Sequence, residues 1–157
     1  MPGKRPESDG TLSAEPPCGV EGLVPHRERM KLVRTLERVG EDWAETETVV
    51  EDGWPMFLDG GVEPVVLVEL IAQSVGVHTG WVRRHIEPMG GRGLLVGVRH
   101  ATFPPGRVAC GTRLRTRVDQ VRQIETYVVY AGTVRDGDRM LCEAEIQAFR
   151  PDDRSWG

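Results

Sequence analysis

The chain has 157 residues, which is enough for one compact domain. Its 20 basic and 24 acidic residues give a net charge of −4, and this argues against a dedicated nucleic-acid-binding protein, which would be strongly basic. Three widely spaced cysteines without zinc-ligand spacing argue against a disulfide scaffold or a metal site and fit reduced thiols in the cytoplasm. Neither a signal peptide nor a membrane span is predicted, because the chain lacks a sufficiently long apolar run.

The first elements in chain order are a lead-in and two strands. Residues 1–20 are rich in Pro, Gly, Ser and charge, which predicts a flexible lead-in with little to bury. One folded domain is expected over residues 21–150, followed by a short tail over 151–157. Within the domain, residues 43–50 alternate between apolar and polar side chains and favour a strand, and residues 30–39 hold a second candidate.

The most informative segment is 62–85, VEPVVLVELIAQSVGVHTGWVRRH. From 65 to 82 it is apolar on nearly every face, with Glu69 as its only charged residue, and Pro64 suits the first turn of a helix. A helix of this kind must be buried on most sides in a soluble protein. Ala72, Gly76 and Gly80 recur every four residues and form a stripe for close packing.

After this helix the pattern changes to strands. Residues 93–103, 111–121, 123–134 and 139–149 are each predicted to be extended. In the second, Leu114, Thr116 and Val118 would face one way and three arginines the other. Asp136-Gly137-Asp138 is typical of a hairpin between the last two strands. The simplest packing is an α+β fold in which one long helix is wrapped by a curved antiparallel sheet.

The charge is uneven along the chain. Residues 62–122 contain 4 acids and 9 bases, a net charge of +5, whereas the flanking parts are acidic. This predicts either a local electropositive surface or arginines that merely solvate the faces of strands.

Several strings in this order resemble the hotdog-fold 3-hydroxyacyl-ACP dehydratases. VPHRERMKLVRTLERV is similar to the family's opening segment, and PVVLVELIAQSVG is similar to its central helix. LLVGVRHATF, PPGRVACGTRL and RMLCEAEIQAF follow as in the family. The similarity is greatest to the branch associated with aryl-polyene clusters, and it implies fatty-acid or polyene-type synthesis. The substrate would be a thioester on the phosphopantetheine arm of an acyl carrier protein, with no other cofactor.

The resemblance implies a catalytic role for Glu69. Dehydration needs a base at C2, an acid at C3 and a donor for the thioester oxygen. A carboxylate in an apolar helix is costly unless it is paired, hydrogen-bonded or protonated. Glu69 is therefore the candidate acid, or else a structural buried acid bonded to a partner chain or to backbone amides. Better-known dehydratases carry a histidine before this helix, but here Gly61 stands in its place.

The remaining site residues follow from the same reasoning. His26 is the candidate base, or it anchors the N-terminal segment. His78 would lie on the opposite helix face from Glu69. Gln73 shares the face of Glu69 and is predicted, with Gly60 and Gly61, to bind substrate. The resemblance implies that it helps to order the site, and the alternative is a packing amide bonded to the backbone. Gly60 and Gly61 offer amides to the thioester, or form a plain turn. Docking of the acidic carrier protein is predicted at basic residues of the middle segment, namely Arg83, Arg84, Arg92 and Arg99.

Three functions are therefore compared. The first is a 3-hydroxyacyl-ACP dehydratase, acting as a homodimer or as a heterodimer with another hotdog dehydratase. The second is a non-catalytic subunit that partners an active dehydratase, which the absent histidine favours. The third is a hotdog acyl thioesterase, which also uses a carboxylate on the helix but is disfavoured by the PHR string.

Overall fold

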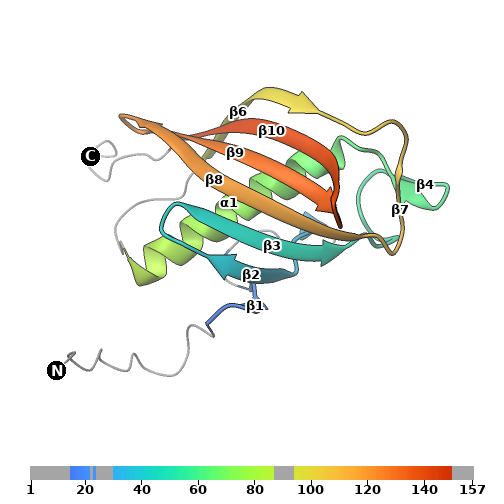
Figure 1. Cartoon of the computed structure of the whole chain (residues 1–157), viewed down its shortest axis with the longest axis horizontal. Coiled ribbons are helices and arrows are strands. Elements are labelled where there is room, and N and C mark those ends of the chain that lie inside the picture. Colours follow the sequence, from blue (N-terminus) through green and yellow to red (C-terminus); the bar gives the residue numbers. More distant parts are fainter. Residues whose placement is uncertain (1–14, 22, 24–29, 87–93, 150–157) are drawn as a thin grey trace.

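The computed structural model describes residues 15–21, 23, 30–86 and 94–149. Within these ranges, one helix, α1 (Val66–His85), lies against a large antiparallel sheet (Figure 1). This is the predicted α+β layout of a single helix wrapped by a curved sheet. We call the sheet face that packs against α1 the inner face and the opposite one the outer face.

The large sheet has seven strands in the order β1-β2-β3-β8-β9-β10-β6, and all neighbours are antiparallel. A smaller sheet has the order β4-β5-β7. The strand that directly follows α1 therefore forms one edge of the large sheet. The strands are β1 (Cys18–Gly19), β2 (Thr35–Val39), β3 (Trp43–Val49), β4 (Phe57–Leu58), β5 (Gly61–Val62), β6 (Leu94–Thr102), β7 (Val108–Ala109), β8 (Arg113–Ile124), β9 (Tyr127–Asp136) and β10 (Arg139–Phe149).

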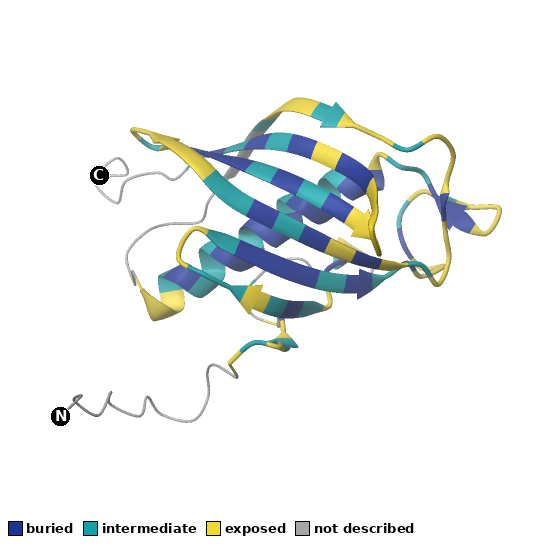
Figure 2. Cartoon of the chain, in the orientation of Figure 1, coloured by how far each residue is buried: buried dark blue, intermediate teal, exposed yellow. Residues whose placement is uncertain are grey.

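Helix α1 packs closely on the inner face, as Figure 2 shows by its buried residues. Leu67, Leu70 and Ile71 are fully buried. At Gly132 of β9, a Cβ atom would lie 2.3 Å from Ile71 Cγ2, so only glycine allows this approach. The face of α1 turned away from the sheet is half-buried, which agrees with the expectation of burial on most sides.

The start of the helix also differs slightly from the prediction. Pro64 precedes α1 instead of opening its first turn, because the helix is capped at Val65. The Pro64 carbonyl accepts a hydrogen bond from the N–H of Leu67 at 2.9 Å. This tight turn connects β5 to the helix.

The strand patterns are confirmed in type, but some boundaries differ. Leu114, Thr116 and Val118 are buried, as the alternation predicts. Strand β8 continues to Ile124, however, and the turn to β9 contains Glu125 at φ 54°. The prediction had placed this break three residues too early, because no glycine, proline or asparagine marks the actual turn.

The N-terminal boundary is corrected as well. Cys18 and Gly19 form β1, which pairs with β2, and Val20 is fully buried. The folded domain therefore begins inside the predicted lead-in. In the predicted 30–39 strand, only Thr35–Val39 pairs as β2. Residues 31–34 are not part of a strand, although the N–H of Arg34 donates to the Glu47 carbonyl of β3 at 3.3 Å.

Candidate functional site

Glu69 lies in the first turn of α1 and is half-buried. Negative charge is favoured near a helix N-terminus by the helix dipole. The backbone before the helix belongs to the small sheet, so the site lies where the two sheets meet at one end of the molecule (Figure 1).

Gln73 is hydrogen-bonded to Glu69, which confirms that the two share one helix face. Gln73 Nε2 donates to Glu69 Oε1 at 3.1 Å. The Gln73 side chain is itself 1% exposed. Its position is fixed by backbone atoms of the segment 30–33, about 40 residues earlier in the chain.

All four hydrogen-bonding positions of the Gln73 amide are occupied within the chain. Oε1 accepts from the N–H of Leu32 at 2.8 Å and of Val33 at 3.3 Å. Nε2 donates to the Met30 carbonyl as well as to Glu69. A direct bond from Gln73 to a substrate would require one of these to break. The geometry therefore favours an ordering role over the predicted contact with substrate.

The segment 30–33 was not recognised as part of the site from the sequence. It receives a further bond from β3, where the Thr48 hydroxyl donates to the Leu32 carbonyl at 2.6 Å. Leu32 and Val33 are fully buried. A local signal existed, because Thr46 and Thr48 are polar residues at inward positions of a strand, but nothing in the sequence identified their partners.

Gly60 and Gly61 lead into the site as predicted, and each needs to be glycine for its own reason. Gly60 has φ +81° in the β4–β5 turn. A Cβ on Gly61 would lie 2.7 Å from the Val108 carbonyl. The Gly60 carbonyl accepts from the N–H of Cys110 at 2.9 Å, and Gly61 is paired with strands on both sides. The role of their amides toward a thioester stays a prediction.

The histidines fall into two groups. His26, the predicted base, lies outside the described residues. His78 is fully buried on the sheet side of α1, opposite Glu69 as expected. Its Nε2 faces the carbonyl oxygens of Gly40 and Glu41 at 3.1 and 3.0 Å, so this nitrogen carries the proton. Nδ1 then accepts from Tyr130 Oη at 3.0 Å.

His85 and His100 also lie away from Glu69. His85 is 16 residues further along α1, about 24 Å at 1.5 Å per residue, and stacks on Trp81. A bulge between Val98 and His100 leaves His100 and Arg99 both exposed on β6. None of the three described histidines therefore shares the helix face that carries Glu69.

The predicted docking arginines are split by the fold. Arg83 and Arg84 lie in the last turn of α1, and Arg92 lies outside the described residues. Arg99 is on the outer face of edge strand β6, where it binds Glu145 at 2.8 Å. The described residues thus do not bring Arg99 together with the helix-end pair.

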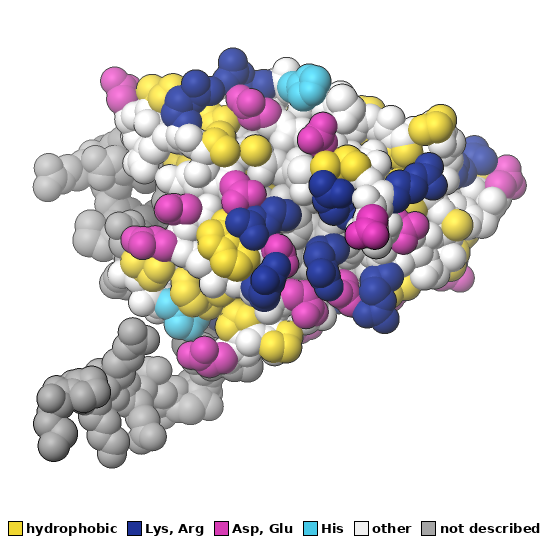
Figure 3. All heavy atoms as spheres, viewed as in Figure 1, with side chains coloured by type: hydrophobic (Ala, Val, Ile, Leu, Met, Phe, Trp, Pro, Cys, Tyr) yellow, Lys and Arg dark blue, Asp and Glu magenta, His cyan; other side chains and the backbone are white. Residues whose placement is uncertain are grey.

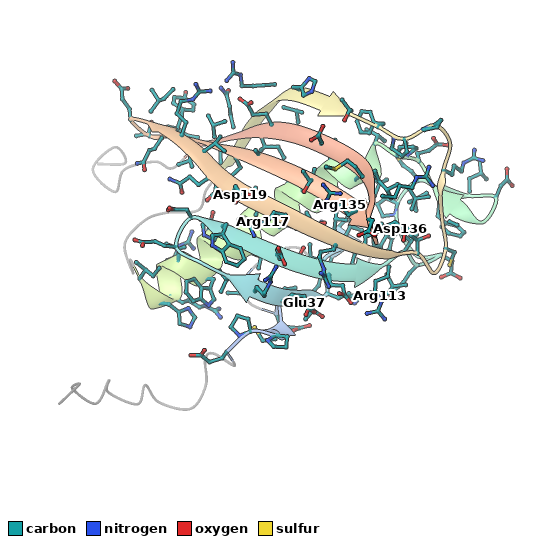
Figure 4. All side chains as sticks on the ribbon, viewed as in Figure 1. Glu37, Arg113, Arg117, Asp119, Arg135 and Asp136 are labelled. Atoms are coloured by element: carbon teal, nitrogen blue, oxygen red, sulfur yellow. The ribbon has the colours of Figure 1, made fainter. Side chains whose placement is uncertain are left out.

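The outer face carries a network of arginines and carboxylates over β2, β3, β8 and β9 (Figures 3 and 4). Glu45 binds Arg38 at 2.7 Å and Arg117 at 3.2 Å. Burial alone would raise the pKa of Glu45, but hydrogen bonds from Arg38 and Arg117 outweigh it and lower the pKa. Arg117 also lies over the Trp43 ring, 4.0 Å from its centroid. The strand arginines therefore pair across strands instead of forming an open positive surface.

Comparison with known proteins agrees with the geometry. The model of one family, described as "ApeP-like: ApeP dehydratase", matches residues 18–156. No curated protein gives a significant sequence match. In the described part of the chain, helix α1 is not apolar enough to cross a membrane.

Among solved structures, the dehydratase heterocomplex ApeI:P from Xenorhabdus doucetiae matches with a TM-score of 0.75 and 21% identity, covering 87% of this chain and 93% of that one. A hypothetical thioesterase with coenzyme A from Streptococcus pneumoniae has a TM-score of 0.60 and 16% identity, covering 74% and 84%. A thioesterase from Haemophilus influenzae has a TM-score of 0.59 and 16% identity, covering 75% of this chain and 78% of that one. These likenesses establish the hotdog fold.

Proposed function

Because the chain belongs to the ApeP-like dehydratase family, we propose that it supplies the acid of a 3-hydroxyacyl-[acyl-carrier-protein] dehydratase. The observation that supports this most directly is the Glu69–Gln73 hydrogen bond at the start of α1. It holds one oxygen of a half-buried carboxylate in place, and a fixed orientation is what a general acid requires.

In the proposed reaction, a base removes a proton from C2 of the acyl thioester. The electron pair left on C2 forms the C2–C3 double bond as the C3–O bond breaks. Protonated Glu69 gives its proton to the departing hydroxyl, which leaves as water. The products are an enoyl thioester, water, a protonated base and ionised Glu69, so one proton returned from base to carboxylate completes the cycle.

The base in this proposal is His26 or a histidine of a second hotdog subunit. The three described histidines do not share the face of Glu69, and Gly61 occupies the place of the usual histidine. A solved structure with a similar fold is titled a dehydratase heterocomplex. In this chain, edge strand β6 pairs only with β10 within the described sheet, and Val98 is 44% exposed. An edge of nine residues is suited to pairing with a partner strand.

Delivery by an acyl carrier protein fits the positions of Arg83 and Arg84. They lie 14 and 15 residues after Glu69, which is about 21 Å along the axis, and within about 60° of it around the helix. Arginines at this end would hold the phosphate of the prosthetic arm while its thioester reaches Glu69. A cytoplasmic location remains the expectation for such a protein.

The test is dehydration of a 3-hydroxyacyl-carrier protein, followed by mass spectrometry of the enoyl product. The full chain is assayed alone and with a histidine-bearing hotdog dehydratase subunit. We expect Glu69→Gln to lower kcat by about 10²–10⁴-fold, the usual contribution of a general acid. His26→Ala assigns the base, since full activity in that variant moves the role to the partner.

The second candidate function is a non-catalytic partner subunit, which the Gly61 position and the heterocomplex likeness favour. In that case the mixed complex would dehydrate the substrate, and Glu69→Gln would leave its rate unchanged. The thioesterase alternative would instead release free thiol from an acyl thioester without forming an enoyl product. Either result would contradict the acid role of Glu69.

A further inference from the structure

A chain of buried hydrogen bonds connects the sheet to Glu69. It begins on β3, where the Thr48 hydroxyl donates to the Leu32 carbonyl at 2.6 Å. The N–H of Leu32 donates to Gln73 Oε1 at 2.8 Å. Gln73 Nε2 then donates to Glu69 Oε1 at 3.1 Å. Thr48 is 3% and Gln73 is 1% exposed, so water cannot substitute freely for these partners.

We propose that Thr48 is a positioning residue for the candidate acid, acting through Leu32 and Gln73. This inference rests on the proposed function of Glu69 and adds a residue on a different element, 21 positions earlier in the sequence. The Thr48 hydroxyl holds the Leu32 backbone in position. The N–H of Leu32 in turn orients the side-chain amide of Gln73, and this amide fixes one oxygen of the Glu69 carboxylate.

The direction of the bonds determines how the Gln73 amide is oriented toward Glu69. Oε1 of Gln73 faces two N–H donors, and its Nε2 faces the Met30 carbonyl and Glu69. The opposite amide orientation would place donors against donors, so only one orientation is compatible. Glu69 Oε1 must therefore accept a bond from Gln73. This bond fixes the position of Oε1 and so restricts the orientation of the Glu69 carboxyl group.

Strand β3 provides a matched control for this role. Thr46 lies two residues before Thr48 on the same inner face and is 1% exposed. Its hydroxyl lies 2.8 Å from Ser74 Oγ, and Ser74 in turn donates to the Leu70 carbonyl. The Thr46 hydroxyl thus bonds to α1 without touching the segment 30–33. Thr46→Val and Thr48→Val remove one buried hydroxyl each at equal volume.

The experiment measures kcat and KM for enoyl formation with the full chain and its partner subunit. We expect Thr48→Val to lower kcat by about tenfold to a hundredfold, since a misplacement of 1 Å can have the larger effect. KM should stay unchanged, Thr48→Ser should restore most of kcat, and Thr46→Val should stay near the wild-type kcat. Equal losses of kcat in both valine variants, or no loss in Thr48→Val, would overturn the proposal.

A second readout does not depend on activity. Amide hydrogen exchange at Leu32 and Val33, and the NMR signals of the Gln73 side-chain amide, report the hydrogen-bond chain directly. They should change in Thr48→Val and remain as in wild type in Thr46→Val. Changes in exchange without any dehydration by the wild-type complex would reject the proposed function while supporting the hydrogen-bond chain. Unchanged exchange in Thr48→Val would reject the chain itself.

Discussion

Between helix α1 and the inner face of the large sheet, polar side chains such as Gln73 and Thr48 are neutral, buried and bonded to specific backbone atoms. On the outer face, many polar side chains are charged, partly exposed and paired across strands, as with Arg99 and Glu145. Most of the charged residues of the sheet belong to the second group, yet the candidate site belongs to the first. The hydrogen bond between one carboxylate and a buried amide, and not the density of charge, therefore marks the site.

The largest loss of stability is expected for Gln73→Leu, which removes hydrogen bonds between α1 and the segment 30–33. It would leave the N–H groups of Leu32 and Val33 without this partner in a buried place, and the Met30 carbonyl would also lose its bond. At about 1–3 kcal/mol for each unsatisfied group, the loss of stability should reach about 3–5 kcal/mol. Urea unfolding at one fixed protein concentration measures it. A loss under about 1 kcal/mol would contradict the importance of the inner-face bonds.

A smaller inner-face effect is expected for Gly132→Ala, because the new methyl group would collide with Ile71 Cγ2. Overpacking of this kind costs about 1–3 kcal/mol. The loss should be less than additive with Ile71→Ala, which removes the colliding atom. Gly97→Ala on β6 is the control, since its Cβ would meet nothing within 4 Å. Similar losses at both glycines would point to backbone effects instead of packing.

The outer face should show a modest pH dependence through Glu45, whose pKa is lowered in the folded protein. A lowered pKa means that the contribution to stability is complete above the ordinary value near 4.5. It is lost as the pH falls through the folded-state pKa. Glu45→Gln should remove this part of the acid sensitivity, which we expect to be up to about 1 kcal/mol for a partly exposed network. Unfolding curves between neutral and acidic pH compare the two proteins.

The smallest effect is expected for Arg99→Ala, also on the outer face. The Arg99–Glu145 pair is 49% and 34% exposed, and Arg122 also reaches Glu145 at 3.7 Å. The loss of stability should be below about 0.5 kcal/mol and should shrink further at high salt. A larger loss would show that the ion-pair network of the outer face acts cooperatively, and the contrast between the two faces would weaken.

The sequence predicted those parts of the fold that depend on local periodicity. The apolar run predicted α1, and the alternation of Leu114, Thr116 and Val118 predicted which face of β8 is buried. The four-residue spacing placed Glu69 and Gln73 on one side of the helix. Pairing at β1 and the turn at Glu125 were missed, because neither carries a local signal strong enough to be recognised.

Sequence alone thus determined the helix, most strands and the residue type at the centre of the candidate site, because these depend on neighbours within a few positions. Only the tertiary structure decided what holds Glu69, since the partners of Gln73 lie about 40 residues away and Thr48 acts through a backbone carbonyl. A backbone partner leaves no trace in residue identity. For the same reason, the sequence left open whether the basic middle of the chain forms one surface. The sheet register distributes its arginines over strands, next to carboxylates of the neighbouring strand.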